Sequence, residues 1–86
     1  MDLMSLKDKY VVLIFHEPIE VNGVLVRSVG GTFGGGTLPG FFALNDIRTV
    51  MGADKTNVTD AVGLRGKIIM GRSENIQTVI SGPAPE

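Results

Sequence analysis

The stretch that decides the predicted fold runs from Phe41 to Met70 and reads FFALNDIRTVMGADKTNVTDAVGLRGKIIM. Near its start, apolar residues recur at the i, i+3, i+6, i+7 spacing that gathers side chains on one face of a helix, at Leu44, Ile47, Val50 and Met51. Gly52 follows, and glycine suits the left-handed conformation in which helices often end. This pattern predicts a short amphipathic helix over residues 43–51.

A second helix is predicted over Thr56–Val62, after the turn at Gly52. Asp54 or Thr56 can supply an oxygen that caps a first-turn amide, and Gly63 is expected to end the helix. The inward face would consist of Val58, Ala61 and Val62. Two short helices joined by a tight turn are the order of a helix-turn-helix. We therefore expect a small α+β domain in which β-hairpins flank this motif.

Polar side chains of the second helix would form a DNA-recognition surface. Asn bonds the edge of adenine, Thr contacts a thymine methyl or a phosphate, and Lys neutralises phosphate. The predicted recognition surface consists of Lys55, Thr56, Asn57 and Thr59. The flanking basic residues expected to meet phosphate are Arg48, Arg65, Lys67 and Arg72. The alternative for the polar residues is an ordinary solvated helix face. The alternative for the basic residues is that their charges protect a strand edge.

The order Phe-Phe-Ala-Leu-Asn-Asp-Ile-Arg-Thr-Val-Met-Gly, with a hairpin before it and Thr-Val-Ile-Ser at residues 78–81, resembles the N-terminal domain of BRO-type antirepressors of phages and large DNA viruses. The second predicted helix and the run from Gly63 to Met70 are similar to the small phage repressor Cro. These resemblances imply a phage-borne DNA-binding regulator. They place the helix Thr56–Val62 in the major groove and the protein in the cytoplasm of the host cell.

The composition indicates one small folded domain. The chain has 86 residues, 43% of them hydrophobic, and no cysteine, so no disulfide framework or thiolate metal site is expected. With four Phe, one Tyr and no Trp, the core depends on aliphatic residues, and a homo-oligomer such as a dimer would add burial. The longest apolar run, Tyr10 to Phe15, is far shorter than the ~20 residues of a membrane span. With no signal peptide pattern, we expect a cytoplasmic protein that does not bind membranes.

The net charge of −1 is the main argument against nucleic acid, because neutralisation of phosphate supplies much of the affinity of such proteins. The distribution of charge is less unfavourable than its sum. Between Arg48 and Arg72, five basic residues stand against Asp54 and Asp60, which gives a local charge of +3. The predicted partner is double-stranded DNA, with a protein partner as the alternative.

Outside this region the sequence predicts strands and loops. Tyr10 to Phe15 is a continuous apolar run typical of a buried strand, and Asn22-Gly23 favours a type I′ hairpin. Six glycines between residues 30 and 40 predict a mobile loop. Lys67–Gly71 and Ile76–Ser81 are expected to pair as a second hairpin. The expected division is a lead-in at 1–9, one domain at 10–82, and a proline-containing tail at 83–86.

Catalytic and metal-binding patterns are missing from the sequence. His16 has Glu17 and Glu20 nearby, but Pro18 breaks the helix that a zinc-protease signature requires. The glycines at 30–40 do not fit a nucleotide-binding register. We therefore predict no metal, no cofactor and no enzyme activity. The predicted function is a small DNA-binding transcriptional regulator or antirepressor. The alternatives are a module that binds a host or phage protein through an exposed strand edge or the Phe33 loop, and a structural virion component.

Overall fold

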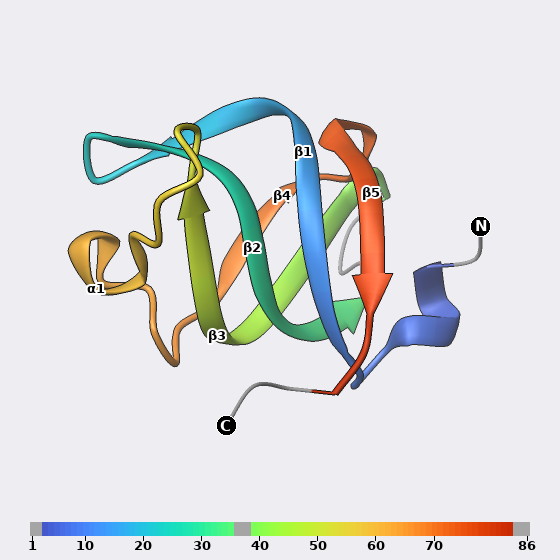
Figure 1. Ribbon diagram of the computed structural model, residues 1–86. Coiled ribbons are helices and arrows are strands. Elements are labelled where there is room, and N and C mark those ends of the chain that lie inside the picture. The colour runs from blue at the N-terminus through green and yellow to red at the C-terminus, as the bar shows by residue number, and fades with distance from the viewer. Residues whose placement is uncertain (1–2, 36–38, 84–86) are drawn as a thin grey trace.

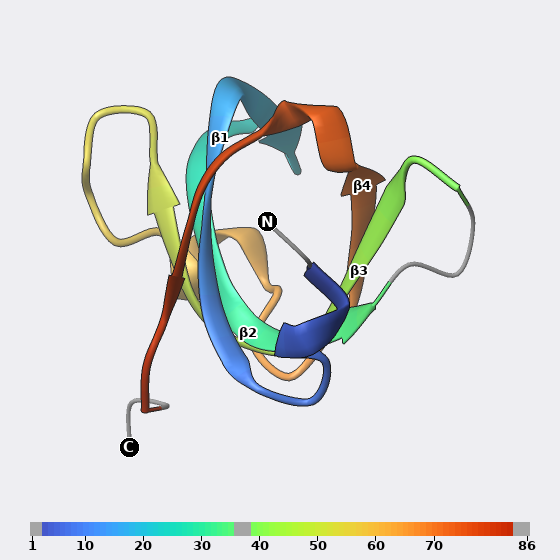
Figure 2. The ribbon, with the colours of Figure 1, turned by 90° about the vertical axis from the view of Figure 1, so that its right-hand side faces the viewer.

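The computed structural model describes residues 3–35 and 39–83 as an antiparallel sheet that curls into an open half-barrel (Figures 1 and 2). In chain order the described elements are η1 (Leu3–Leu6), β1 (Tyr10–Val21), β2 (Val24–Gly35), β3 (Phe41–Gly52), α1 (Thr59–Val62), β4 (Ile69–Arg72), η2 (Ser73–Asn75) and β5 (Ile76–Ser81). The strands lie side by side in the order β4-β3-β2-β1-β5. The prediction of an α+β domain with a helix-turn-helix is wrong, because the described residues form mainly strands and one four-residue α-helix.

The first two strands form the long hairpin around which the sheet is built. Val11, Leu13 and Phe15 point into the interior of the half-barrel and are buried, whereas Val12 and Ile14 are only half-buried. β1 therefore has one buried face and not the two covered faces that its continuous apolar run predicted. The predicted hairpin turn is confirmed: Val21 pairs with Val24, and both central residues have positive φ, 50° at Asn22 and 80° at Gly23.

Glycines let β2 lie close to its neighbours. The prediction of a mobile loop over residues 30–40 is wrong for residues 30–35, which belong to β2, while 36–38 lie outside the described residues. A Cβ atom at Gly31 would lie 2.8 Å from the backbone oxygen of Asn45, and one at Gly30 would overlap the Tyr10 hydroxyl. Bare backbone at these positions therefore permits a close approach of strands rather than a loop.

The segment predicted as the first helix is the strand β3. Leu44, Ile47 and Val50 are all fully buried, although successive residues of a regular strand face opposite sides. Four steps along β3 separate Asn45 from Thr49, whereas two steps along β2 separate their partners Thr32 and Gly30. β3 thus contains a bulge of two extra residues, which includes Asp46 at a φ of 47°. Leu44 and Val50 lie on the same face on either side of the bulge, and Ile47 within the bulge is also buried, which produces the three-residue spacing that resembles a helix.

The predicted recognition helix Thr56–Val62 is also wrong in its extent. Residues 53–58 form a turn and a loop that returns along β3, where Met51 and Asn57 make an isolated bridge. Only Thr59–Val62 is helical, and Gly63 ends it in the left-handed conformation, as predicted. Val62 is buried as expected, whereas Ala61 is exposed.

The last two strands lie at opposite edges of the sheet. The prediction that they form a hairpin is wrong: β4 pairs with the first half of β3, and β5 pairs with the first half of β1. The 3-10 turn η2 connects them across the open side of the half-barrel (Figure 2). The short turn between two β-rich runs suggested local pairing, but the inward side chains of the two strands cover different parts of one core.

The core fills the concave side of the sheet. Its fully buried side chains are Val11, Leu13, Phe15, Val26, Val29, Phe33, Phe42, Leu44, Ile47, Val50 and Val62. Leu6 of η1 packs against them from the lead-in segment. In the part of the chain that the structure describes, no helix is long and apolar enough to cross a membrane.

Candidate functional site

The sheet order leaves β4 and β5 as its outer strands. β4 has β3 on one side and β5 has β1 on one side, and within residues 3–35 and 39–83 neither has a strand on its other side. An outer strand presents a row of backbone N–H and C=O groups that can pair with another strand. Monomeric proteins usually block such edges with charges, prolines or bulges.

These two edges carry few blocking residues. β5, with the sequence IQTVIS, contains no charged residue and no proline. β4, with the sequence IMGR, contains a single charge at its last position, Arg72. The irregularity in the β1–β5 ladder, between Ile14 and Phe15, lies near the start of β5 and leaves residues 78–81 in regular pairing.

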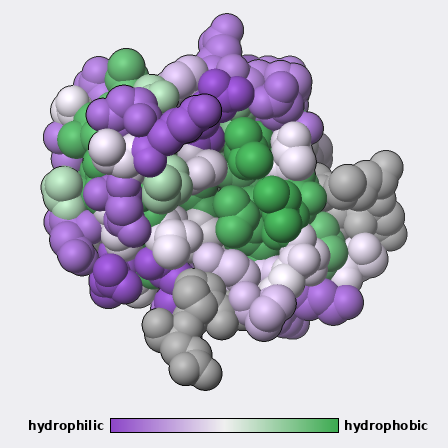
Figure 3. All heavy atoms as spheres, viewed as in Figure 1, coloured by the Kyte–Doolittle hydropathy of each residue, from purple (hydrophilic) through white to green (hydrophobic). Residues whose placement is uncertain are grey.

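Apolar side chains lie on the convex face beside each edge. Next to β4 the exposed fractions are 64% for Ile68, 55% for Met70 and 38% for Phe41. Next to β5, Ile80 is 52% exposed and pairs with the half-buried Val12. Figure 3 shows hydrophobic surface gathered over β1 and extending toward β5. Each free edge is therefore bordered by an apolar strip.

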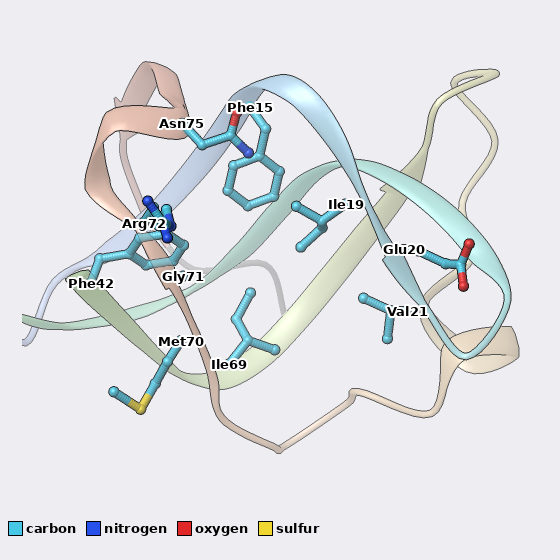
Figure 4. A pocket seen from close by; sticks show the side chains of 10 residues that line it. All are labelled: Phe15, Ile19, Glu20, Val21, Phe42, Ile69, Met70, Gly71, Arg72 and Asn75. Carbon is cyan, nitrogen blue, oxygen red and sulfur yellow. The ribbon is translucent and has the colours of Figure 1, made fainter. Parts of the chain in front are cut away.

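A groove of about 370 Å³ lies between β4 and the second half of β1 (Figure 4). The rings of Phe15 and Phe42 lie on its inner side, with their centroids 6.1 Å apart. Ile19 and Val21 line one wall and Ile69 lines the other, so the groove is largely apolar. β5 does not pair with β1 along this wall, because the last pair of their ladder is Phe15 with Ile76.

Polar residues gather at one end of the groove, around η2. Asn75 Nδ2 donates to the backbone oxygen of Glu17 at 3.1 Å, and Asn75 Oδ1 accepts from the backbone N–H of Glu17 at 3.0 Å. Arg72 makes an exposed ion pair with Glu74 at 3.4 Å. Among the described residues, His16 and the acids beside it do not form a group that could hold a metal ion.

The residues predicted to recognise DNA do not lie together on one helix. Lys55 and Thr56 lie in the turn after β3, and Thr56 donates from its hydroxyl to Asp54 at 2.6 Å. The Thr56 backbone N–H also donates to Asp54, at 3.2 Å. The bond from the hydroxyl, and after it the bond from the N–H, lowers the pKa of Asp54 below the ordinary 3.8. Asn57 accepts from the hydroxyl and N–H of Thr59.

Thr59, predicted to face outward, is instead 1% exposed. Its hydroxyl oxygen accepts the backbone N–H of Val50 at 2.9 Å and its hydroxyl donates to Asn57 at 2.7 Å. Asn57 and Thr59 thus fix α1 against β3. The prediction of a recognition helix is wrong because its polar side chains form hydrogen bonds with nearby backbone groups, as Asn and Thr often do outside helices.

The predicted phosphate-binding residues belong to different elements of the structure. Arg48 is in β3, Arg65 and Lys67 are in the connection from α1 to β4, and Arg72 ends β4. Three of them pair with acids at the surface: Arg48 with Asp46 at 3.2 Å, Arg65 with Asp60 at 3.3 Å and Arg72 with Glu74 at 3.4 Å. Arg65 also donates a hydrogen bond to the Arg48 backbone oxygen at 3.5 Å. DNA binding by these residues stays a prediction.

The edge strands were not assigned as the site from the sequence. The sequence of β5 has no charged residue, which is typical of an unprotected edge. The predicted hairpin of β4 with β5 placed the two strands side by side, so neither was expected to be a free edge. Comparison with protein-family models, with curated proteins and with solved structures finds no match for this chain. The resemblance to BRO-type antirepressors and to Cro therefore stays a prediction.

Proposed function

We propose that this protein is an assembly module whose copies associate head to tail, the free edge of β4 in one copy pairing with the free edge of β5 in the next. The observation that carries the proposal is the presence, at both ends of one curled sheet, of a nearly uncharged edge bordered by exposed apolar side chains. It shares the exposed strand edge with the protein-binding alternative to DNA binding, but that alternative had a host or phage protein as its partner and this proposal has a second copy of the chain.

Backbone pairing would satisfy both edges at once. Each joint uses one β4 edge and one β5 edge, so every copy within a chain of copies has both of its edges covered. A head-to-tail joint of this kind closes into a ring or continues as a filament, depending on the rotation between copies.

The apolar strips favour the same joint. Ile68 and Met70 border β4 on the convex face, and Ile80 borders β5 on the same face of the sheet. When β4 and β5 of different copies become neighbours, the two strips meet and leave water together. Burial of apolar surface contributes roughly 25 cal/mol per Å² and adds to the pairing of backbone groups.

A symmetric dimer through two β5 strands is the competing arrangement. It would bury Ile80 of both copies, but it would leave the β4 edge and Met70 in water. The two arrangements differ in the number of copies and in which edge is required.

Sedimentation velocity on single-site variants distinguishes these arrangements. Met70→Lys and Ile80→Lys place a charge beside one edge each, at positions already more than half exposed, so the monomer fold should be retained. Leu25→Lys is the matched control, because Leu25 is 53% exposed on β2, away from both edges. We expect assemblies larger than a dimer for the unsubstituted chain and for Leu25→Lys, and monomers for each edge variant.

Mixing the two edge variants is the decisive step. Met70→Lys retains an intact β5 edge and Ile80→Lys retains an intact β4 edge, so an equimolar mixture should form a 1:1 dimer through one joint. A symmetric β5 joint predicts instead that Met70→Lys alone is dimeric and that the mixture forms no 1:1 complex. An unsubstituted chain that sediments as a monomer up to millimolar concentration would refute assembly altogether.

A further inference from the structure

We infer that the joint between copies is antiparallel and has one register, with Ile69 of one copy opposite Val79 of the next and Ile68 opposite Ile80. This inference rests on the proposed head-to-tail assembly and names the residues that give it specificity. It follows from the direction of the two edge strands, from the face on which each side chain lies, and from the cost of the neighbouring registers.

The directions of the two strands favour an antiparallel joint. In Figure 1, β4 ascends toward η2 and β5 descends from it, although both belong to one sheet, because the sheet curls strongly between them. Copies related by rotation about an axis along these strands keep both directions. β4 of one copy then meets β5 of the next with opposite direction.

The side-chain faces restrict the register to steps of two residues. Ile69 pairs with the buried Leu44 and so lies on the concave face, which places Met70 on the convex face. Ile68 directly precedes β4 and is 64% exposed, so an extension of the strand by one residue would place it on the convex face as well. On β5, Val79 pairs with the buried Leu13, which places Thr78 and Ile80 on the convex face. A shift of one residue would exchange the two faces of one strand, so concave residues must pair with concave residues.

Among the permitted registers, the pairing of Ile69 with Val79 covers the most exposed aliphatic side chains. It sets Ile68, 64% exposed, against Ile80, 52% exposed, and it joins β-branched residues on both faces. A shift of two residues in one direction sets Met70, 55% exposed, opposite Ile80, but it leaves Ile69 opposite Ser81 and the more exposed Ile68 opposite Gly82. A shift in the other direction sets Lys67 opposite Val79 on the concave face, where a charge is disfavoured.

The charges at the ends of the joint agree with this register. Arg72 ends β4 and would lie beside the start of β5 in the next copy, which begins two residues after Glu74. Arg72 and Glu74 of one copy are already 3.4 Å apart and are exposed, so either can exchange its partner for the equivalent residue of a neighbour. Such an exchange would add a charge pair to the joint without leaving a charge unpaired.

Disulfide trapping tests the register directly, because the chain has no cysteine of its own. Equimolar Ile68→Cys and Ile80→Cys chains are assembled, oxidised with copper phenanthroline and digested for mass spectrometry of the linked peptides. Residues directly opposite each other on antiparallel strands lie within the Cα separation that a disulfide bridges, whereas diagonal neighbours are farther apart. Met70→Cys mixed with Ile80→Cys is the matched control, and we expect its cross-link to form at least about tenfold more slowly.

Each outcome separates the register from the assembly. A dominant 68–80 disulfide supports the proposed register. A dominant 70–80 disulfide refutes this register while the head-to-tail joint stands, and a dominant 80–80 disulfide refutes both in favour of a symmetric joint. If the reduced cysteine variants and the unsubstituted chain all sediment as monomers, the proposed function fails and the register fails with it.

Discussion

Asn75 holds the backbone of Glu17 through both atoms of its side-chain amide, at 3.0 and 3.1 Å, across 58 positions of the sequence. The contact lies where the β1–β5 ladder ends, just after the pair of Phe15 with Ile76. An amide side chain therefore replaces the next backbone neighbour of β1. It fixes η2 against β1 and so determines the direction in which β5 begins.

Substitution of Asn75 by Ala should lower the free energy of unfolding by about 1–2 kcal/mol, because two hydrogen bonds are lost at a partly hydrated position. Glu74→Ala is the matched control within the same turn. Its ion pair with Arg72 is exposed, so we expect a change below about 0.5 kcal/mol. Urea unfolding at one protein concentration measures both values, and equal losses for the two variants would contradict the role of the Asn75 amide.

The tip of the first hairpin is bonded to the end of α1. Asn22 Nδ2 donates to the Val62 backbone oxygen at 2.6 Å, and Asn22 itself has a φ of 50°. Asn22→Gly keeps this backbone conformation and removes the hydrogen bond, so it should cost about 1 kcal/mol. Asn22→Ala should cost about 1 kcal/mol more, since a Cβ disfavours positive φ. Thermal unfolding measures both variants. If Asn22→Ala unfolds at the same temperature as Asn22→Gly or at a higher one, the backbone conformation is not under strain.

The close approach of β2 and β3 at Gly31 should not tolerate a methyl group. A Cβ there would lie 2.8 Å from the Asn45 backbone oxygen and 3.2 Å from both Leu44 and Ile47. Gly31→Ala should therefore destabilise the fold by about 1–3 kcal/mol through overpacking. Gly82→Ala provides the control, because no atom lies within 4 Å of the added methyl and φ is not positive. A Gly31→Ala variant as stable as Gly82→Ala would mean that β2 and β3 separate more readily than the close contact implies.

Local signals predicted the parts of the fold that depend on neighbouring residues. The continuous apolar run at the start of β1 predicts a strand and Asn22-Gly23 predicts a hairpin turn, and both are present. β3 was misassigned because its burial pattern depends on pairing with β2. The bulge at Asp46 separates the buried Leu44 from the buried Ile47 by two residues, a spacing that helices also show. The aromatic and β-branched residues of this segment favour a strand, but the spacing of its apolar residues alone does not distinguish a bulged strand from a helix.

The candidate interface was missed for a related reason. Which strands become edges is a property of the whole sheet, and β4 and β5 become edges only because the long β1–β2–β3 meander occupies the centre. The Phe41-Phe42 pair shows the same dependence. Only Phe42 of the two rings is buried, and it packs beside Phe15 of β1, a contact that depends on the curl of the whole sheet.

Thr59 should behave as a structural residue. Thr59→Val keeps the shape of the side chain but leaves the Val50 N–H and the Asn57 amide oxygen without the hydroxyl that each contacts. The expected loss is about 1–3 kcal/mol in the free energy of unfolding, because the Val50 N–H is buried and would lose its hydrogen-bond acceptor. Thr59→Ser retains the hydroxyl and should lose less. If Thr59→Val unfolds at the same urea concentration as the unsubstituted chain, the hydroxyl does not stabilise the contact of α1 with β3.

Asp54 should titrate below its ordinary pKa and so respond to acid in a defined direction. The Thr56 hydroxyl and the Thr56 N–H both donate to its carboxylate and favour the charged form, which lowers the pKa below 3.8. A lowered pKa in the folded state means that the stabilising contribution is fully present above the unfolded value of about 3.9. It is then lost as the pH falls through the lower folded pKa.

Carboxyl carbon shifts measured by NMR against pH should therefore give Asp54 a midpoint below 3.8. In Thr56→Val the midpoint should move up toward 3.8, because the hydroxyl that lowers the pKa most is removed while the backbone N–H remains. The stability advantage over Asp54→Asn should shrink as the pH falls below about 4. A midpoint that does not change in Thr56→Val would assign the lowered pKa to a cause other than the Thr56 hydroxyl.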